Sequence, residues 1–133
     1  MTALPVAFKT LLSAFKRAEE LDRDPQRENR IVAYHIRFYA ITKATKLMTG
    51  APDEQRYIGE QIGLLEKLAP ALNIQDGEGK RVCIQQATTL FDRADEIDRA
   101  GLADKATAKL FYTAATIYDC LEQFGEQDPE VWF

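Results

Sequence analysis

Apolar residues recur at helical spacing along almost all of this 133-residue chain, and almost no stretch alternates apolar and polar residues as a half-buried strand does. The segment 103–124 illustrates the pattern. Its apolar stripe has spacings of four, four, three, four and three, and consists of Ala106, Leu110, Ala114, Ile117, Leu121 and Phe124. Such spacings place side chains on one face of an α-helix. The sequence therefore predicts an all-α fold.

Glycines, prolines and polar connectors divide this pattern into five helices. We expect helices at about 5–21, from near Asn29 to before Gly50, from a cap at Asp53 to a stop at Pro70, at about 80–100, and at about 103–124. The second is apolar on most sides, so it should touch more than one neighbour and lie centrally. Gly101 should end the fourth helix, with Leu102 packing back onto Ile97.

The stretch ALNIQDGEGK, residues 71–80, is the best loop in the sequence because it has two glycines and an Asp-Gly turn signal. We expect it to separate two small modules, residues 1–72 and 80–133, with a linker at 73–79. The length fits one compact domain or two very small modules that share a core. The final EQDPEVWF ends on two aromatic residues, which we interpret as a chain cut before its next element.

The composition favours a globular cytoplasmic protein. A net charge of −4 disfavours nucleic-acid binding, which depends on neutralising phosphates with basic side chains. Cys83 and Cys120 match no metal or redox spacing, so we interpret both as reduced. The N-terminal sequence lacks the features of a signal peptide, and no apolar run approaches the roughly 18 residues of a membrane span.

Two charged nonapeptides resemble one another. FKRAEELDR (15–23) and FDRADEIDR (91–99) are identical at six of nine positions, and each precedes a break and a helix that carries Phe-Tyr. The offset is 76 residues for the nonapeptides and 73 for the Phe-Tyr pairs. This order favours a duplicated helical hairpin over chance reuse of common helix residues. In the second copy we expect Phe91, Ala94 and Ile97 to be buried and the charges to face solvent.

No pattern of catalytic residues is present. His35, the one histidine, lacks the acidic residue three positions earlier that a Glu-x-x-His metal motif needs. An Asp-rich magnesium site at Asp22, Asp95 and Asp98 would need a bound divalent ion to support it. There is no Gly-rich phosphate loop, nucleophile elbow or useful Cys/His pairing. We therefore expect no enzyme activity, no metal and no cofactor.

Four motifs resemble, in order, the Vta/LIP family of regulatory cofactors of the AAA ATPase that disassembles ESCRT-III polymers. VAYHIRFYA (32–40) is similar to the family's VAYYCRLYA-type motif. ADEIDRAG (94–101), LFYTAA (110–115) and FG (124–125) resemble its AD-x-x-DRAG … FYTAS … FG pattern. RAEELDRDP (17–25) is similar to its AQEHDKRDP-type ending. Together these motifs cover nearly the whole chain.

The resemblance implies tandem microtubule-interacting-and-transport (MIT) modules, each a three-helix bundle, of which the second here lacks its last helix. It implies binding of the C-terminal amphipathic helices of CHMP-type ESCRT-III subunits in a groove between the second and third helices. In the first module this groove would run between helices 31–48 and 53–69. The residues expected to form it are Ile58, Ile62, Leu65, Ile41 and Ala44. The resemblance also implies a cytoplasmic protein that its partners recruit to endosomes during multivesicular-body sorting.

Two departures from the family pattern limit these expectations. The connector QRENR (26–30) lengthens the approach to VAYHIRFYA, so the first interhelical turn should differ. The family's C-terminal dimerising, ATPase-binding segment is absent, so we expect ESCRT-III binding without stimulation of the ATPase. A helical-repeat scaffold of the tetratricopeptide type, with an unrelated protein partner, is the alternative to this adaptor role.

Overall fold

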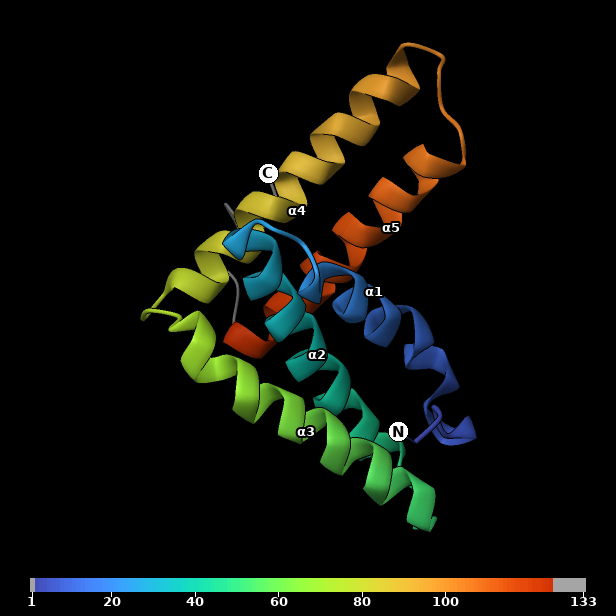
Figure 1. Ribbon diagram of the computed structural model, residues 1–133. Helices are drawn as coiled ribbons and strands as arrows, with labels where there is room; N and C mark the ends of the chain where they lie inside the picture. The colour runs from blue at the N-terminus through green and yellow to red at the C-terminus, as the bar shows by residue number, and fades with distance from the viewer. Residues whose placement is uncertain (1, 126–133) are drawn as a thin grey trace. The chain divides into compact units, whose positions relative to one another are not determined.

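The computed structural model describes residues 2–125. Within this range the chain forms five α-helices, two 3₁₀ helices and no strand, which confirms the all-α prediction (Figure 1). The elements are, in chain order, η1 (Val6–Leu11), α1 (Leu12–Asp22), α2 (Arg27–Leu47), α3 (Pro52–Leu72), α4 (Glu78–Arg99), α5 (Lys105–Cys120) and η2 (Leu121–Phe124). They divide into two compact units between Gln75 and Asp76, within the predicted linker. We call them unit 1 and unit 2.

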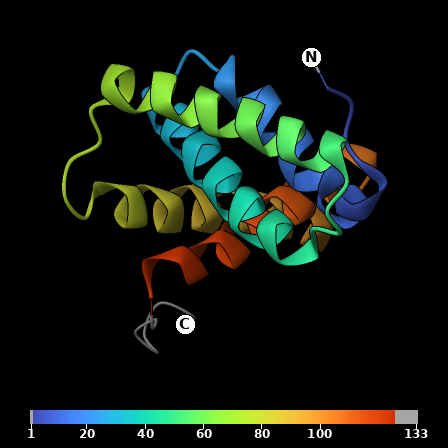
Figure 2. The same cartoon turned by 90° about the horizontal axis from the view of Figure 1, so that it is seen from below.

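Helix α2 is the central element of unit 1. It packs against α1, η1 and α3, as its apolar residues on most sides predicted (Figures 1 and 2). A helix that contacts three neighbours must bury side chains around most of its circumference. Its buried residues are Ile31, Val32, Ala33, Ile36, Arg37, Ala40, Ile41 and Ala44.

An aromatic cluster joins the N-terminal helical segments of unit 1 to α3. The ring of Tyr57 meets Phe15 edge-on at a centroid distance of 5.2 Å and lies 6.2 Å from the ring of Phe8. Edge-to-face pairs at these separations are the favoured geometry of aromatic rings. Burial, reinforced by the charge of Glu19, raises the pKa of the Tyr57 hydroxyl to about 12. The cluster therefore fixes α3 against the first helical segments.

The prediction of one continuous α-helix over residues 5–21 was wrong, because this segment consists of two different helices. Val6–Leu11 is a 3₁₀ helix, and the α-helix begins at Leu12. Leu11 has φ −101° and ψ 4°, outside the α-helical region, and this residue separates the two segments. The backbone therefore changes from the tighter to the wider helix at that point.

The predicted limits of α3 were wrong at both ends. Pro52 occupies the first turn, where its missing N–H costs nothing, and Asp53 is not the cap. Glu54 instead accepts hydrogen bonds from the backbone N–H groups of Thr49 and Gly50, and so ties the preceding turn to the helix. Pro70 lies inside the helix, near its end, where its missing N–H removes a single helical bond.

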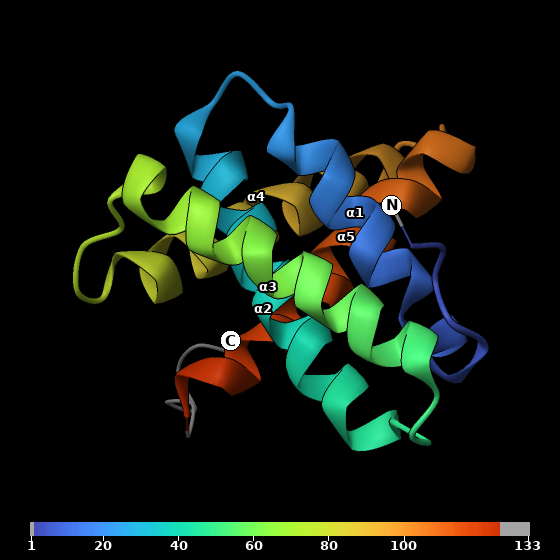
Figure 3. The ribbon, with the colours of Figure 1, turned by 60° about the horizontal axis from the view of Figure 1, so that its bottom comes forward.

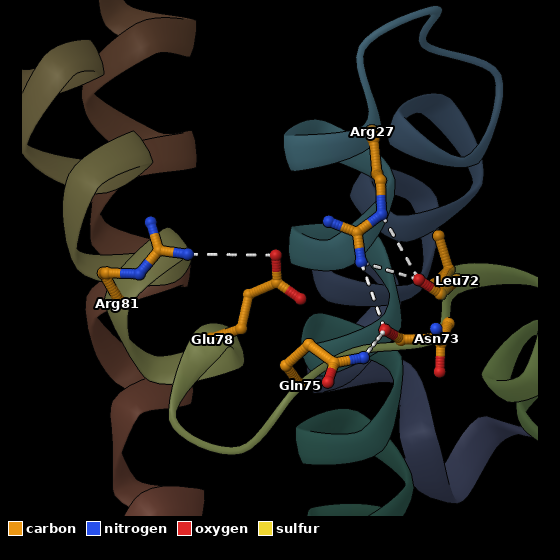
Figure 4. A network of polar contacts seen from close by, with 6 residues as sticks. All are labelled: Arg27, Leu72, Asn73, Gln75, Glu78 and Arg81. Carbon is orange, nitrogen blue, oxygen red and sulfur yellow. Dashed lines mark hydrogen bonds and ion pairs between the residues drawn. The ribbon is translucent and has the colours of Figure 1, made fainter.

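The C-terminus of α3 is held by side chains as well as by backbone. The chain leaves the helix at Asn73, whose φ of 48° is left-handed. The guanidinium of Arg27, at the start of α2, donates from Nη2 to the Leu72 carbonyl at 2.7 Å and to the Asn73 carbonyl at 3.3 Å (Figure 4). Gln75 donates to the same Asn73 carbonyl at 2.9 Å. These bonds satisfy carbonyls that a helix end otherwise leaves without partners.

In the described range, unit 2 is an antiparallel hairpin of α4 and α5, with η2 at its end (Figure 1); the chain end predicted to be cut, residues 126–133, lies outside that range. Helix α4 begins at Glu78, so the last two residues of the predicted linker are helical. At its start, Arg81 lies 3.8 Å from the carboxylate of Glu78 (Figure 4). Asp104 caps α5 by accepting the N–H of Thr107 at 3.0 Å, and the Thr107 hydroxyl accepts the Asp104 N–H in return.

The second charged nonapeptide ends α4 in the predicted way. Gly101 has φ 74°, its N–H donates to the Asp98 carbonyl at 3.0 Å, and the Leu102 N–H donates to the Ile97 carbonyl at 3.1 Å. This is the Schellman pattern. The Leu102 side chain, which was predicted to pack back onto Ile97, is instead 71% exposed.

The buried edge predicted for this nonapeptide was only partly correct. Ala94 is fully buried and Ile97 is half-buried. Phe91 is 44% exposed, and its ring meets that of Phe111 edge-on at 5.6 Å. Arg99 Nη2 and Asp95 Oδ2 form an ion pair at 3.0 Å.

Candidate functional site

Unit 1 carries an apolar groove between α2 and α3, with a volume of about 400 Å³. Four residues of α2 and four of α3 line it: Tyr34, Phe38, Ile41, Thr42, Ile62, Leu65, Glu66 and Ala69. The α2 positions are spaced by four, three and one, and the α3 positions by three, one and three. Each set therefore occupies one face of its helix, and the two faces meet as the walls of the groove.

The groove has exposed apolar edges above a buried floor. Phe38 on α2 is 45% exposed and Ile62 on α3 is 40% exposed. Ile41 and Leu65 are buried, at 7% and 8% exposure. Large apolar side chains at a surface lose water-exposed area when a partner covers them. The arrangement suits an elongated apolar ligand that lies along the groove.

The five residues predicted for this site fall into two groups. Ile41, Ile62 and Leu65 line the groove. Ile58 and Ala44, at 7% and 0% exposure, are buried in the core of unit 1 and do not line it. The row on α3 that was expected to face the ligand therefore has two groove residues, Ile62 and Leu65, in place of three, and Ile62 is the exposed one.

The prediction missed the aromatic wall of the groove. Tyr34 and Phe38 of α2 line the groove and were not among the five residues predicted for it. Tyr34, Phe38 and Thr42 are four residues apart, so they follow one edge of α2. The polar residue at the end of this row, Thr42, was the sequence signal that this edge faces solvent, and Thr42 is exposed in the structure.

Among the lining residues described, Glu66 is the charged one, and it is exposed. It lies one helical turn from both Ile62 and Ala69 on α3. A carboxylate beside an apolar surface attracts a basic side chain of a partner, with a strength that falls as salt increases. The groove therefore combines apolar contact with one acidic position at its edge.

A buried charge network supports the groove from below. Arg37 is 1% exposed; its Nη2 and Nη1 contact the two carboxylate oxygens of Asp22 at 2.7 and 3.1 Å, and its Nε donates to the Gln61 side chain at 3.0 Å. Arg37 and Gln61 directly precede Phe38 and Ile62 in sequence. Their hydrogen bond therefore holds the two walls of the groove at a defined separation.

The acidic residues do not assemble a metal centre in the described range, 2–125. No group of three or more His, Cys, Asp or Glu side chains there is placed to hold an ion. Asp22 is engaged by Arg37, as described above. The ring of His35 meets that of Tyr34 edge-on at 5.2 Å, which places it beside the groove wall.

Among the helices of residues 2–125, none has the length and apolar content to cross a membrane.

Comparison with known proteins agrees with the motifs. A family model described as "Vta1 like" matches residues 10–132. The chain is 33% identical over 129 residues to an Arabidopsis thaliana protein named "homolog of mammalian LYST-interacting protein 5", covering 92% of this chain and 28% of that protein. It is 32% identical over 133 residues to the "vacuolar protein sorting-associated protein VTA1 homolog" of Homo sapiens, covering 96% of this chain and 42% of the relative.

A more distant relative extends this similarity. The Dictyostelium discoideum protein of the same name is 26% identical over 137 residues, which cover 98% of this chain and 24% of that protein. The chain thus spans less than half the length of these relatives. The family model nevertheless covers both units of the chain, so this chain belongs to the Vta1-like family.

Proposed function

We propose that unit 1 is an MIT-type helix-binding module, and that this chain acts as an adaptor in vacuolar protein sorting. Its ligands would be the C-terminal amphipathic helices of ESCRT-III subunits, seated in the groove between α2 and α3. The observation that carries this proposal is the pairing of exposed Phe38 and Ile62 across a groove with a buried apolar floor. The names of the relatives, which are vacuolar protein sorting-associated proteins, support the pathway.

The chemistry of the groove defines the ligand. A helix that presents apolar residues at i, i+3, i+4 and i+7 would place them along the floor formed by Ile41 and Leu65. A basic residue next to this stripe would reach Glu66. We expect dissociation constants in the micromolar range, on the order of −8 kcal/mol at 1 μM, as for a single short helix in a groove. Binding at this groove involves no covalent chemistry, so the role is regulatory.

In the cell, this role would place the protein in the cytoplasm, with recruitment to endosomes through its ESCRT-III partners. The chain spans less than half the length of the relatives it matches, so regulation of the vacuolar-protein-sorting AAA ATPase is proposed for the whole protein, and helix binding for unit 1.

The test is a titration of the chain with a panel of basic amphipathic peptides from ESCRT-III C-termini, followed by calorimetry. Two matched variants identify the groove. Ile62→Asp, at a 40% exposed position of this groove, should abolish binding while the helical circular dichroism and cooperative melting persist. Leu12→Asp, at a 42% exposed position of α1 outside this groove, should leave the affinity unchanged.

The acidic edge has its own test. Glu66→Lys should weaken the binding of a basic peptide, because an attraction becomes a repulsion. The affinity of this variant should then rise with added salt, whereas that of the unaltered chain should fall. Flat isotherms across the whole panel would overturn the assignment to ESCRT-III helices. Loss of binding in Leu12→Asp, with Ile62→Asp unaffected, would move the site to another face of unit 1.

A further inference from the structure

The residues ahead of the first helical segment are attached to α3 by a single carboxylate. Thr2 donates its backbone N–H to Oε1 and Oε2 of Glu60, at 3.1 and 3.0 Å. The Thr2 hydroxyl donates to Oε1 at 2.7 Å. These bonds join positions 58 residues apart in the sequence. A segment without helical hydrogen bonds of its own is therefore held in a defined place.

This segment forms one wall of a second groove of unit 1, between α1 and α3, with a volume of about 290 Å³. Residues 2–4 line it together with Leu12 and Phe15 of α1 and Tyr57 of α3. Figure 3 shows the N-terminal coil running beside α1 before the chain turns into η1. The groove thus has apolar walls, and the chain's own N-terminal residues form part of its boundary.

The charges around Glu60 favour this attachment. Hydrogen bonds from the Thr2 hydroxyl and N–H lower the pKa of the Glu60 carboxyl, with smaller contributions from nearby positive charge, including Arg56. Lys16 and Glu19 of α1 line the same groove. Glu60 is consequently ionised at neutral pH, and hydrogen bonds to an ionised acceptor are stronger than those to a neutral one.

The two grooves of unit 1 differ in one respect. All lining residues of the α2/α3 groove belong to α2 and α3 themselves, whereas the α1/α3 groove includes residues 2–4. We propose that residues 2–4 are a releasable strap that covers one side of the α1/α3 groove and closes it to a partner, with Thr2 and Glu60 as its latch. While the strap is in place, the α2/α3 groove is the one open to a partner helix.

The strap is built for release without unfolding. Ala3 is exposed, and Thr2 and Leu4 are half-buried, so little core area depends on them. Pro5 and Phe8 behind it are buried, and Phe8 donates its N–H to the Pro5 carbonyl at 3.0 Å. The anchored η1 segment therefore marks where the strap ends. The strap donates one hydroxyl and one backbone N–H of Thr2 to Glu60, and it places the Leu4 side chain against the groove. A peptide that replaces the strap should carry the same three groups.

The latch is tested by the mobility of Ala3 and Leu4 in the full chain, measured as the ¹H–¹⁵N heteronuclear NOE. In the unaltered chain these amides should be nearly as rigid as those of α1. Glu60→Gln removes the charged acceptor and keeps helix propensity, so it should make both amides mobile. Glu19→Gln is the matched control, because it makes the same charge change at a residue that lines the groove, whereas the strap's hydrogen bonds go to Glu60.

The groove is tested by supplying the strap in trans. The probe is an acetylated peptide of residues 2–6, Thr-Ala-Leu-Pro-Val, added to a full-length variant in which residues 2–4 are all glycine. The peptide should shift the resonances of Tyr57 and Glu60 in this variant at least about tenfold more than in the unaltered chain at equal concentration. A peptide with valine in place of its threonine should lose this effect, because it cannot donate a hydroxyl to Glu60.

Three results decide the proposal. High mobility of Ala3 and Leu4 in the unaltered chain would overturn it, and so would equal mobility in Glu60→Gln and Glu19→Gln. Equal peptide shifts in the glycine variant and the unaltered chain would show that the strap does not close the groove. None of these measurements uses an ESCRT-III helix, so the strap can fail while the function proposed for the α2/α3 groove stands, and the reverse.

Discussion

The guanidinium of Arg37 and the carboxylate of Asp22 form a bidentate pair, with Nη2–Oδ2 and Nη1–Oδ1 distances of 2.7 and 3.1 Å. Arg37 is 1% exposed, and its Nε also donates to Gln61. One side chain of the central helix thus binds the last residue of α1 and the middle of α3. Since Arg37 and Gln61 adjoin Phe38 and Ile62, the same network sets the width of the groove.

Removing the carboxylate should be costly at this position. Asp22→Asn leaves the buried charge of Arg37 without its counter-ion, and breaking buried pairs in this way destabilises proteins by about 3 kcal/mol or more. The matched control is Asp98→Asn, the repeat counterpart on α4, which is exposed and should change stability by less than about 0.5 kcal/mol. Urea unfolding of the two variants measures both values. Equal effects would mean that the Arg37 pair contributes nothing specific.

Two isoleucines one turn apart on α3 should respond differently to truncation. Ile58→Ala removes a side chain that is 7% exposed, and core truncations of this kind cost about 2–5 kcal/mol. Ile62→Ala acts at a 40% exposed position and should cost less than about 1 kcal/mol while it weakens peptide binding. Thermal unfolding and calorimetric titration separate the two effects. A larger loss of stability from Ile62→Ala would place that residue in the core.

Acid should weaken the turn between α2 and α3. The hydroxyl of Thr49, together with the backbone N–H groups of Thr49 and Gly50, lowers the pKa of Glu54 below its ordinary value of 4.5. A lowered pKa means that the folded state binds protons less readily than the unfolded state, so stability is present above the ordinary pKa and is lost as pH falls through the folded value. Glu54→Gln should therefore destabilise the protein at neutral pH and much less at about pH 2.

The sign of this effect is tested by denaturant unfolding across the acid range. The difference in stability between the unaltered chain and Glu54→Gln should shrink steadily as the pH falls below 4.5. A difference that stays constant through this range would show that Glu54 acts through its shape and not through its charge.

The cysteines of unit 2 should resist thiol reagents in the folded protein. Cys83 is fully buried, and burial raises its thiol pKa from 9.0 to about 12, which lowers the thiolate fraction roughly a thousandfold at a given pH. Burial likewise raises the pKa of Cys120, with a further contribution from the nearby Cys83. Labelling should be slow in buffer and fast in urea. Rapid native labelling would show that the α4/α5 hairpin opens readily.

Local sequence was a sound guide to the helices and to several of their ends. Gly101 stops α4, as predicted, because glycine reaches a positive φ at little cost, wherever the rest of the chain lies. Pro70 was a poor guide, because a proline near the end of a helix forfeits only one hydrogen bond. Three of the five predicted groove residues line the groove, because helical period identifies which residues share a face.

Which residues of a shared face are covered depends on the neighbouring helix. Ile58 and Ile62 lie in one row of α3, yet one is in the core and the other at the surface. Helical period cannot separate them, because the point at which α2 covers that row depends on how the two helices cross. The aromatic wall of the groove escaped prediction for the same reason.

The two nonapeptides show most directly what sequence alone determined and what the tertiary structure decided. Similar local sequences form the ends of two helices, α1 and α4, as backbone propensity and patterning require. Their matching aspartates nevertheless differ: Asp22 pairs with a buried arginine and Asp98 is exposed. At the offset of the Phe-Tyr pairs, position 37 is Arg and position 110 is Leu. Asp22 meets its partner on the following helix, so this contact depends on how α1 and α2 pack and not on the nonapeptide alone.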